Sequence, residues 1–210
     1  MVQILSTDIS TLNQETYQQL YAAASCSRRE RADRYRNFSD AVRCLAGEVL
    51  LRQALNAVFG QWENFSLAQS EYGKPYVIGQ PDFHFSISHS GKWVVLAYGC
   101  TELGVDVQDL DSKKNAEAVS RRFFTEEEQQ FLAAQADKSL AFSKIWTGKE
   151  SYLKYLGTGL AKSLTSFSVL SPEEGIHYFW ETLDGCRLCL CTQEESYKLT
   201  LFDINSRKFF

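Results

Sequence analysis

The chain has 210 residues, of which 44% are hydrophobic, so it can build a sizeable core in one large domain or two small lobes. Its net charge of −4 provides no overall attraction to nucleic acid or to a membrane surface. The N-terminal residues lack the basic region and apolar run of a signal peptide, and no apolar run approaches a membrane span. Six cysteines without an export signal favour reduced thiols, so we expect a cytoplasmic protein that binds neither a membrane nor nucleic acid.

The first part of the chain predicts a strand, a helix and an arginine-rich segment. Residues 2–5 are an apolar strand candidate, and residues 14–24 are expected to form a helix. Residues 27–36 are dense in arginine with acidic residues interspersed, which is typical of a solvated helix face crossed by ion pairs. Arg28 and Arg31 lie three residues apart, so they could equally grip one phosphate.

A long amphipathic helix is predicted over residues 39–59. Apolar side chains recur there every three or four residues, Ser39 is a candidate N-cap, and Gly60 is a candidate stop. Arg43 lies in the first turns of this helix.

The middle of the chain predicts a turn followed by a hairpin. Gly and Pro mark a turn around Lys74. Residues 83–88 alternate, with Ser88 opposite the apolar face, and residues 93–99 return as a second strand. His89 follows the first strand among hydroxyls and a lysine, where it could be a structural side chain or an anion ligand.

One carboxylate interrupts an otherwise apolar strand. The strand alternates between apolar and polar positions: Leu103, Val105 and Val107 on one face, Asp106 and Gln108 on the other. A buried carboxylate needs a compensating charge, which a hard cation would supply. The alternative is that Asp106 lies at a strand end and caps a loop.

A second carboxylate lies on the helix predicted around residues 145–154, which Gly157 would end. Trp146, Glu150 and Lys154 are four residues apart and share one stripe that is half apolar. The two charged groups would be costly to bury unless each meets an opposite charge or a metal. The alternative is a weak salt bridge between them on a solvated face.

The remainder of the second half predicts helical pieces and strands. Thr125 and Glu128 form a candidate capping box. Strands are expected at residues 167–169, 177–183, 186–191 and 196–203. For the three clustered cysteines, a strand is favoured over a zinc site: Cys186, Cys189 and Cys191 alternate with leucines. Helices followed by strands occur twice, so two α+β lobes are expected with a seam near residue 100.

Four motifs then occur in a specific order and spacing. They are Gly73-Lys74-Pro75, Phe85-Ser86-Ile87-Ser88-His89-Ser90-Gly91, Gly104-Val105-Asp106-Val107, and Trp146-Thr147-Gly148-Lys149-Glu150-Ser151 with Lys154 and Gly157-Thr158-Gly159-Leu160. Together they resemble the surfactin-type 4'-phosphopantetheinyl transferases, over about residues 28–169. The resemblance implies an α+β fold of two similar α/β lobes in a pseudo-twofold arrangement. The lobes would be residues 1–100 and 101–210, with the active site in the cleft between them.

The resemblance also implies an activity. A monomeric enzyme would transfer 4'-phosphopantetheine from coenzyme A to a serine of an apo acyl or peptidyl carrier protein domain, releasing adenosine 3',5'-bisphosphate. Mg²⁺, with Mn²⁺ as a substitute, would be the cofactor. Such enzymes serve fatty acid, polyketide or nonribosomal peptide biosynthesis.

The resemblance assigns roles to particular residues of this chain. The metal would be held by Asp106, Gln108 and Glu150. Lys154 would neutralise charge developing on the phosphate, and Glu150 or a metal-bound water would take the serine proton. The 3'-phosphate would meet Arg28, Arg31 and His89. The nucleotide pocket would be lined by Arg43, Lys74 and Ser88. The carrier domain would dock on residues 157–164, including Lys162.

Gln108 departs from the family pattern, which commonly has an acid at this place. An amide oxygen can ligate Mg²⁺ but brings no charge, so we expect weaker metal affinity or an altered metal preference. Two other hypotheses remain. An impaired relative that binds coenzyme A or carrier domains as a regulator is supported by Gln108 alone. A nucleic-acid-binding module built on the arginine-rich segment is disfavoured by the net charge and by the lack of interleaved aromatic residues.

Overall fold

The computed structural model describes residues 1–62, 65–110 and 116–205. The first half contains β1 (Val2–Asp8), a 3-10 helix (Ile9–Thr11), α1 (Gln14–Ala23), α2 (Cys26–Asp33), α3 (Phe38–Phe59), β2 (Leu67–Gln69), β3 (Pro75–Val77), β4 (His84–Ser90) and β5 (Trp93–Gly99). The second half contains β6 (Leu103–Asp109), α4 (Ala116–Phe123), α5 (Glu126–Ala134), α6 (Lys138–Leu156), two 3-10 helices (Gly159–Ala161 and Leu164–Ser166), β7 (His177–Leu183), β8 (Cys186–Thr192) and β9 (Tyr197–Leu201). The predicted α+β class is confirmed.

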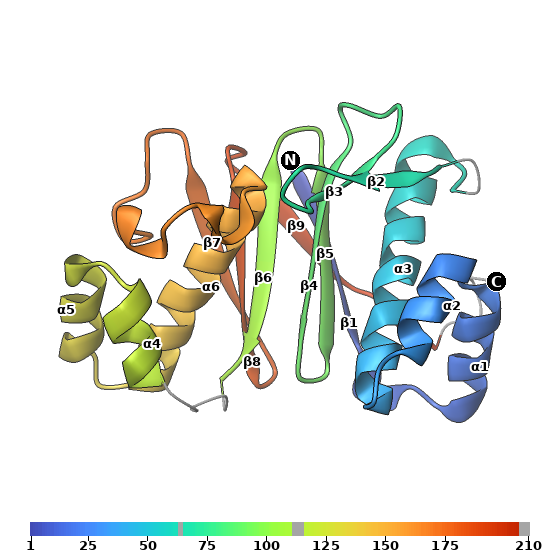
Figure 1. Cartoon of the computed structure of the whole chain (residues 1–210), viewed down its shortest axis with the longest axis horizontal. Coiled ribbons are helices and arrows are strands. Elements are labelled where there is room, and N and C mark those ends of the chain that lie inside the picture. The colour runs from blue at the N-terminus through green and yellow to red at the C-terminus, as the bar shows by residue number, and fades with distance from the viewer. Residues whose placement is uncertain (63–64, 111–115, 206–210) are drawn as a thin grey trace.

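The strands occupy the middle of the molecule, with α1–α3 at one end and α4–α6 at the other (Figure 1). One sheet has the order β4-β5-β1-β9, a second has the order β6-β8-β7, and β2 pairs with β3. β1 is antiparallel to β5 and parallel to β9. The last strand of the chain therefore returns to the sheet that the first strand began. The expected division at residue 100 stays a prediction, and β9 would cross it.

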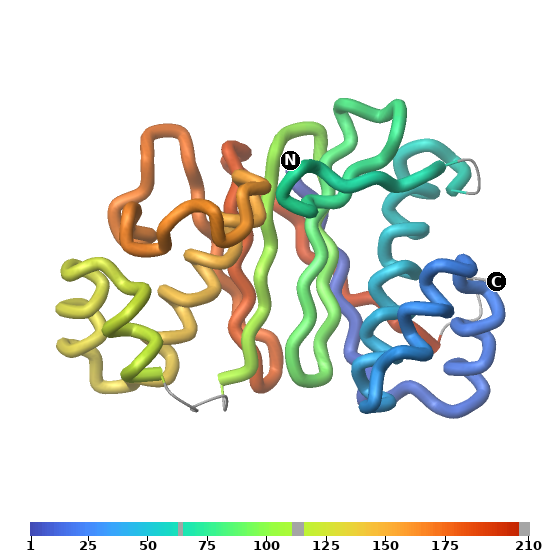
Figure 2. Tube along the Cα trace, in the orientation of Figure 1, coloured from blue at the N-terminus to red at the C-terminus, as the bar shows by residue number. Residues whose placement is uncertain are grey.

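The two larger sheets meet along β4 and β6, which lie side by side in Figures 1 and 2. These strands belong to different sheets, and serine hydroxyls connect them instead of a backbone ladder. The backbone N–H groups of Val105, Val107 and Asp109 donate to the Oγ atoms of serines on β4, at 3.1, 3.3 and 3.0 Å. The polar face predicted for residues 83–88, continued by Ser90, thus lies at the junction of the two sheets.

Helix α3 covers the first sheet and contributes most of its apolar side chains to the core beneath it. The helix ends at Gly60, which has φ 72° and adopts the left-handed conformation that glycine tolerates best, as predicted. Its N-cap is Asn37 and not Ser39, so that prediction is wrong. The chain is already helical at Phe38, because the extended residue that opens the helix comes two positions earlier than the serine.

Helix α6 lies directly on the backbone of β6. A Cβ atom at Gly104 would lie 2.0 Å from the backbone oxygen of Ser151 and 2.3 Å from the backbone nitrogen of Tyr155, so only glycine fits there. Gly157, with φ 68°, ends the helix as predicted. This close approach places the side chains of α6 beside those of β6.

Three further predictions, a strand, a capping box and a cysteine-bearing strand, have different outcomes. Residues 167–169 are not a strand. The N–H of Val169 donates to the buried carboxylate of Glu128 at 2.9 Å, where a strand would have required a neighbouring chain. The capping box of Thr125 and Glu128 is confirmed.

The three clustered cysteines lie buried on β8, as predicted for a strand. Burial raises the pKa of the Cys186 thiol to about 11. In the described part of the chain, no helix combines the length and apolar character that crossing a bilayer requires.

Candidate active site

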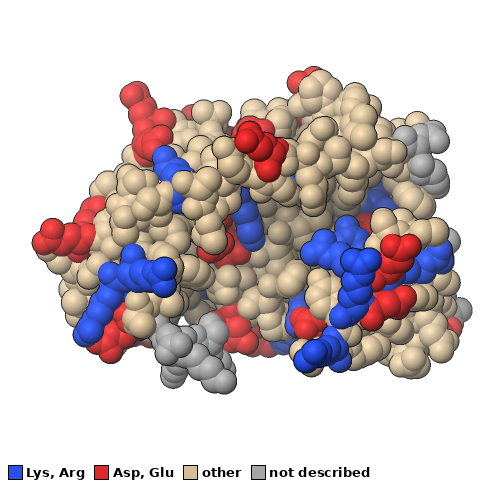
Figure 3. Space-filling view, in the orientation of Figure 1, with Lys and Arg blue, Asp and Glu red and all other residues tan. Residues whose placement is uncertain are grey.

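Two adjoining pockets form a cleft between α2–α3 on one side and α6 on the other. The first, of about 490 Å³, is lined by Arg28, Arg31, Arg43 and His89, among others. The second, of about 330 Å³, is lined by residues that include Lys74, Glu150 and Lys154. Gly73, Pro75, Phe85 and Ile87 line both pockets, which makes them neighbours. Figure 3 shows the molecule hollowed between its two ends, with basic side chains gathered at the α2 end.

Asp106 is a buried acidic group that contacts Lys154, one of the residues lining the second pocket. It is only 2% exposed on β6. Its Oδ1 accepts the Ser88 hydroxyl and the Lys154 ammonium, both at 2.7 Å. Its Oδ2 accepts the side-chain amide of Gln108 at 3.1 Å. The buried carboxylate is therefore compensated by a cation from α6, and it does not cap a loop.

Lys154 is the group that joins α6 to this carboxylate. Its ammonium also lies 2.9 Å from the Ser88 hydroxyl. The ion pair that the structure shows for Lys154 is with Asp106 on another element, and not the salt bridge with Glu150 that was the alternative. Because Gly104 lets α6 approach β6, a cation on the helix can reach a carboxylate on the strand.

Glu150 lies one turn before Lys154 on α6 and lines the second pocket. Asp106 and Lys154 are its charged neighbours. Desolvation raises the pKa of the Glu150 carboxyl, and the negative charge of Asp106 raises it further, while Lys154 lowers it. Two carboxylates thus lie close enough to repel, with one ammonium near both. A further cation between them would relieve this repulsion.

The donor set fits a hard divalent cation. Among the described residues, no group of three or more His, Cys, Asp or Glu side chains is placed to hold a metal ion. Mg²⁺, however, often binds one or two carboxylates and completes its shell with waters and substrate phosphates. Asp106 and Glu150 would supply those carboxylates, and Gln108 could add its amide oxygen after a half-turn of the amide. Oxygen-only donors suit Mg²⁺ or Mn²⁺.

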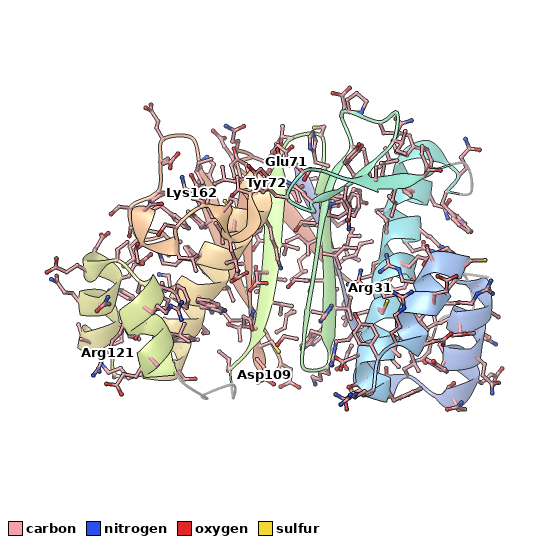
Figure 4. All side chains as sticks on the ribbon, viewed as in Figure 1. Arg31, Glu71, Tyr72, Asp109, Arg121 and Lys162 are labelled. Carbon is pink, nitrogen blue, oxygen red and sulfur yellow. The ribbon has the colours of Figure 1, made fainter. Side chains whose placement is uncertain are left out.

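The opposite wall of the cleft is basic. Arg28 and Arg31 come from α2, and in Figure 4 Arg31 lies on the side of α2 that faces the strands. A hydrogen bond with Tyr35 raises the pKa of Arg31, so the guanidinium stays charged. The Nε of Arg28 lies 3.4 Å from a carboxylate oxygen of Glu48 on α3.

Arg43 and His89 close this wall at the turn between β4 and β5. Arg43 donates to the backbone oxygen of Gly91 at 2.6 Å and pairs with Asp40, which fastens the hairpin turn to α3. His89 lies within β4, which continues to Ser90. Desolvation lowers the pKa of His89, and the charges of Arg43 and Lys154 lower it further.

Lys74 is placed differently from the other predicted pocket residues. Its ammonium donates to the backbone oxygens of Tyr155 at 2.8 Å and Leu103 at 3.3 Å, and it pairs with Glu102. A Cβ atom at Gly157 would lie 2.8 Å from the Lys74 side chain. Lys74 lines the second pocket, but its charge connects the end of α6 to the start of β6.

A buried ion pair beneath α6 was missed by sequence reasoning. Lys149 and Glu128 are both fully buried and lie 2.7 Å apart. Lys149 also donates to the backbone oxygens of Leu164 and Phe167, at 2.7 and 2.8 Å. Lys149 adjoins Glu150 in the motif, so its charge was open to a functional interpretation, whereas the structure gives it a supporting role. The available signal was a lysine next to Glu150 on the helix, turned about 100° away from it and so facing a different neighbour.

Comparison with known proteins agrees with this geometry. Residues 12–101 match the family model "4'-phosphopantetheinyl transferase, N-terminal", and residues 102–201 match the "4'-phosphopantetheinyl transferase superfamily". A 4'-phosphopantetheinyl transferase of Bacillus subtilis is 36% identical over 188 residues, which cover 87% of this chain and 83% of that protein.

Two further relatives extend the comparison. The 4'-phosphopantetheinyl transferase Sfp of Bacillus subtilis strain 168 is 34% identical, with 78% of this chain and 74% of that protein covered. The transferase HetI of a Nostoc strain is 30% identical, with 75% and 69% covered. The family predicted from the four motifs is thereby confirmed. The chain belongs to the 4'-phosphopantetheinyl transferases and is an enzyme of that family.

Proposed function

We propose that the enzyme transfers 4'-phosphopantetheine from coenzyme A to a serine hydroxyl of an apo acyl or peptidyl carrier domain, with Mg²⁺ as cofactor and release of adenosine 3',5'-bisphosphate. The observation that carries the proposal is the convergence of Asp106, Glu150 and Lys154 beside a pocket lined with arginine. Phosphoryl-type transfer asks a protein mainly to position its substrates and to stabilise phosphate charge.

The first pocket suits the nucleotide end of coenzyme A. Arg28 and Arg31 would contact its 3'-phosphate, since guanidinium groups match the geometry of phosphate oxygens. Desolvation and the charges of Arg43 and Lys154 lower the pKa of His89, and a bound phosphate would raise that pKa. Arg43 and Ser88 flank the path from this pocket to Asp106.

The reacting end would lie between β6 and α6. Asp106 and Glu150 would hold the metal, with Gln108 as a third oxygen donor, and a bound Mg²⁺ supplies charge neutralisation to the pyrophosphate. The serine oxygen forms a bond to the phosphorus attached to pantetheine, and the bond from that phosphorus to the bridging oxygen breaks. The ammonium of Lys154 would stabilise the charge on the phosphate oxygens. Glu150, or a water on the metal, would take the serine proton.

The carrier domain would dock beside the second pocket. Tyr72 and Leu160 are 55% and 79% exposed and both line that pocket. In Figure 4 Tyr72 and Lys162 lie at the same end of the molecule, on segments from the two halves of the chain. The exposed apolar side chains of this rim would contact the carrier domain, with Lys162 as a cation for an acidic partner and with Glu71 beside Tyr72 as an acidic group on the same rim. This is the surface expected to include residues 157–164.

We further propose that the enzyme acts as a monomer in the cytoplasm. One chain provides both carboxylates and the basic wall, so a second copy is not required to complete the site. All six cysteines are free thiols, which suits a reducing compartment. The carriers would belong to fatty acid, polyketide or nonribosomal peptide biosynthesis.

The test is the intact mass of an apo carrier domain after incubation with the enzyme, coenzyme A and Mg²⁺ or Mn²⁺. The expected result is the gain of one phosphopantetheine with release of adenosine 3',5'-bisphosphate. Glu150→Ala should abolish the gain. If wild-type enzyme modified no carrier type while still binding coenzyme A, the regulator hypothesis would replace this proposal.

A further inference from the structure

A buried carboxylate behind the basic wall has no role in the proposed reaction. Glu48 lies on α3 beneath α2 and is only 9% exposed. Its Oε1 accepts the backbone N–H of Ser25 and its Oε2 accepts the Ser25 hydroxyl, both at 3.1 Å. Arg28 and Arg52 both pair with the same carboxylate. Glu48 therefore joins the start of α2 to the middle of α3.

Ser25 shows that this connection takes precedence over local capping. It is the N-cap of α2, yet its side chain makes no capping hydrogen bond within the helix. A serine at this position normally accepts from the first turn of its own helix. Here the hydroxyl donates to Glu48. The position of α2 relative to α3 is thus set by the Glu48 carboxylate.

The same carboxylate orients Arg28. Its Oε2 lies 3.4 Å from the Nε of Arg28, while Nη1 of Arg28 lies 3.7 Å from the Cys44 thiol. Arg28 and Cys44 both line the first pocket. The ion pair with Glu48 and the contact with Cys44 hold the guanidinium at the wall of the pocket, where Nη2 has no protein partner among the hydrogen bonds of the described residues. A guanidinium held in this way loses less rotamer entropy when it binds a phosphate.

Arg52 explains why Glu48 does not cancel the charge of Arg28. Arg52 pairs with Glu48 and stacks on Trp62, its guanidinium carbon 3.7 Å from the ring centroid. One carboxylate is thus shared by two guanidinium groups, and the cluster keeps one net positive charge. Arg52 balances Glu48, so Arg28 remains available to an anion.

We propose that Glu48 is a positioning residue that holds Arg28 for the 3'-phosphate of coenzyme A, and so sets the preference of the enzyme for coenzyme A over 3'-dephospho-coenzyme A. This inference rests on the proposed function, in which Arg28 contacts that phosphate. Glu48 acts through Arg28 and through the placement of α2, without touching the substrate.

Calorimetric binding of the two nucleotides, together with steady-state kinetics, tests the inference. Glu48→Gln keeps the shape of the side chain and removes its charge. We expect it to weaken coenzyme A binding about 10-fold, because Arg28 loses the charged partner that holds it in place. Binding of 3'-dephospho-coenzyme A should not change, and the loss should appear in KM with kcat preserved. Glu30→Gln, an exposed change of equal charge on α2, should leave both nucleotides unaffected.

Ser25→Ala provides a second variant that keeps the carboxylate and removes one contact to α2. This variant should also weaken coenzyme A binding, by a smaller factor than Glu48→Gln. It serves as the test if Glu48→Gln does not fold. An equal loss for both nucleotides, or no loss for either, would overturn the inference and leave the transferase proposal intact. If wild-type enzyme did not bind coenzyme A at all, the proposed function would fail with it.

Discussion

The two long helices of the molecule pack on their sheets in different ways. On α3, a Cβ atom added at Gly47 would make an ordinary 3.5 Å contact with Ile87, so side chains separate this helix from its sheet. On the α6 side, a Cβ atom at Gly104 would lie 2.0 Å from the helix backbone. The direct approach of α6 brings Lys154 to Asp106, whereas the spacing at α3 leaves room for the first pocket. One packing forms the proposed reactive centre and the other forms the proposed binding wall.

The buried charges of the two helices differ as well. The carboxylate of Glu48 is shared by two arginines and a serine around α3. On the α6 side, Lys149 is the ammonium paired with the fully buried carboxylate of Glu128. Glu48 keeps a cation when one arginine is removed, whereas Glu128 keeps only the N–H groups of Thr125 and Val169 when Lys149 is removed. We therefore expect the first cluster to tolerate the loss of one cation better than the second.

Replacing Gly104 and Gly47 separately by alanine tests the difference in packing. Of the changes considered, this one has the largest expected effect on the free energy of unfolding. Gly104→Ala should destabilise the protein by more than about 4 kcal/mol, because strand and helix backbones must separate. Gly47→Ala should be neutral or stabilising by up to about 1 kcal/mol, since alanine favours a helix interior. Urea unfolding followed by circular dichroism measures both changes. Similar losses in the two variants would contradict the comparison.

Removing one cation from each cluster tests the difference in redundancy. Lys149→Met leaves the Glu128 carboxylate buried without its ammonium, and should cost about 3 kcal/mol of unfolding free energy. Arg52→Met leaves Glu48 with Arg28 and Ser25, so a loss of about 1 kcal/mol is expected. Adding Glu128→Gln to Lys149→Met should restore part of the loss. A double variant less stable than the single one would show that the pair is not the cause.

The binding wall should also respond to pH through His89. Its pKa in the free enzyme lies below the ordinary value of 6.5, because of desolvation and the charges of Arg43 and Lys154, which Asp40 opposes in part. A bound phosphate favours the protonated ring, so the pKa rises on binding. Coenzyme A affinity should therefore be highest below the free pKa and fall as pH rises through the bound pKa.

Calorimetry in buffers of different ionisation enthalpy measures the proton uptake that this linkage requires. His89→Ala should abolish the share of uptake due to the ring and weaken coenzyme A about 10-fold. His177→Ala, on β7, serves as the control. Unchanged proton uptake in His89→Ala would exclude the histidine as the titrating group, and would leave the phosphates of the ligand as the source.

The smallest expected effect concerns the reactive centre. Gln108→Glu adds a carboxylate next to Asp106 and replaces the amide that now donates to it. The Mg²⁺ concentration for half-maximal transfer should fall about fivefold, because a third charged oxygen donor strengthens binding of a hard cation. Mn²⁺ binding followed by electron paramagnetic resonance provides a readout independent of turnover. Gln130→Glu, exposed on α5, controls for net charge. If Gln108→Glu did not alter the metal dependence of transfer, the uncharged amide would not be the cause of weaker metal binding.

Much of this organisation could be predicted from local patterns. Apolar spacing and glycine stops located α3 and α6, since both depend on the conformational preferences of neighbouring residues. Alternation along residues 103–108 separated Asp106 from the core face of its strand. Four motifs in order identified the family. Local preference also misled, at Ser39, where the helix begins two residues earlier than a serine cap would place it, and at residues 167–169, where the N–H of Val169 bonds to Glu128.

Only the tertiary structure decided which charges meet. The sequence placed Lys154 four residues from Glu150, but its ammonium pairs with Asp106, which lies 48 residues earlier. It placed Lys74 beside the nucleotide pocket, but that ammonium binds the end of α6. It offered no reason to connect Glu48 with Arg28, or the last strand with the first. Spacing along a chain determines which side chains share a face of a helix or strand. The partner of a buried charge depends instead on which backbone segments can approach each other. In this protein, glycines such as Gly104 control that approach.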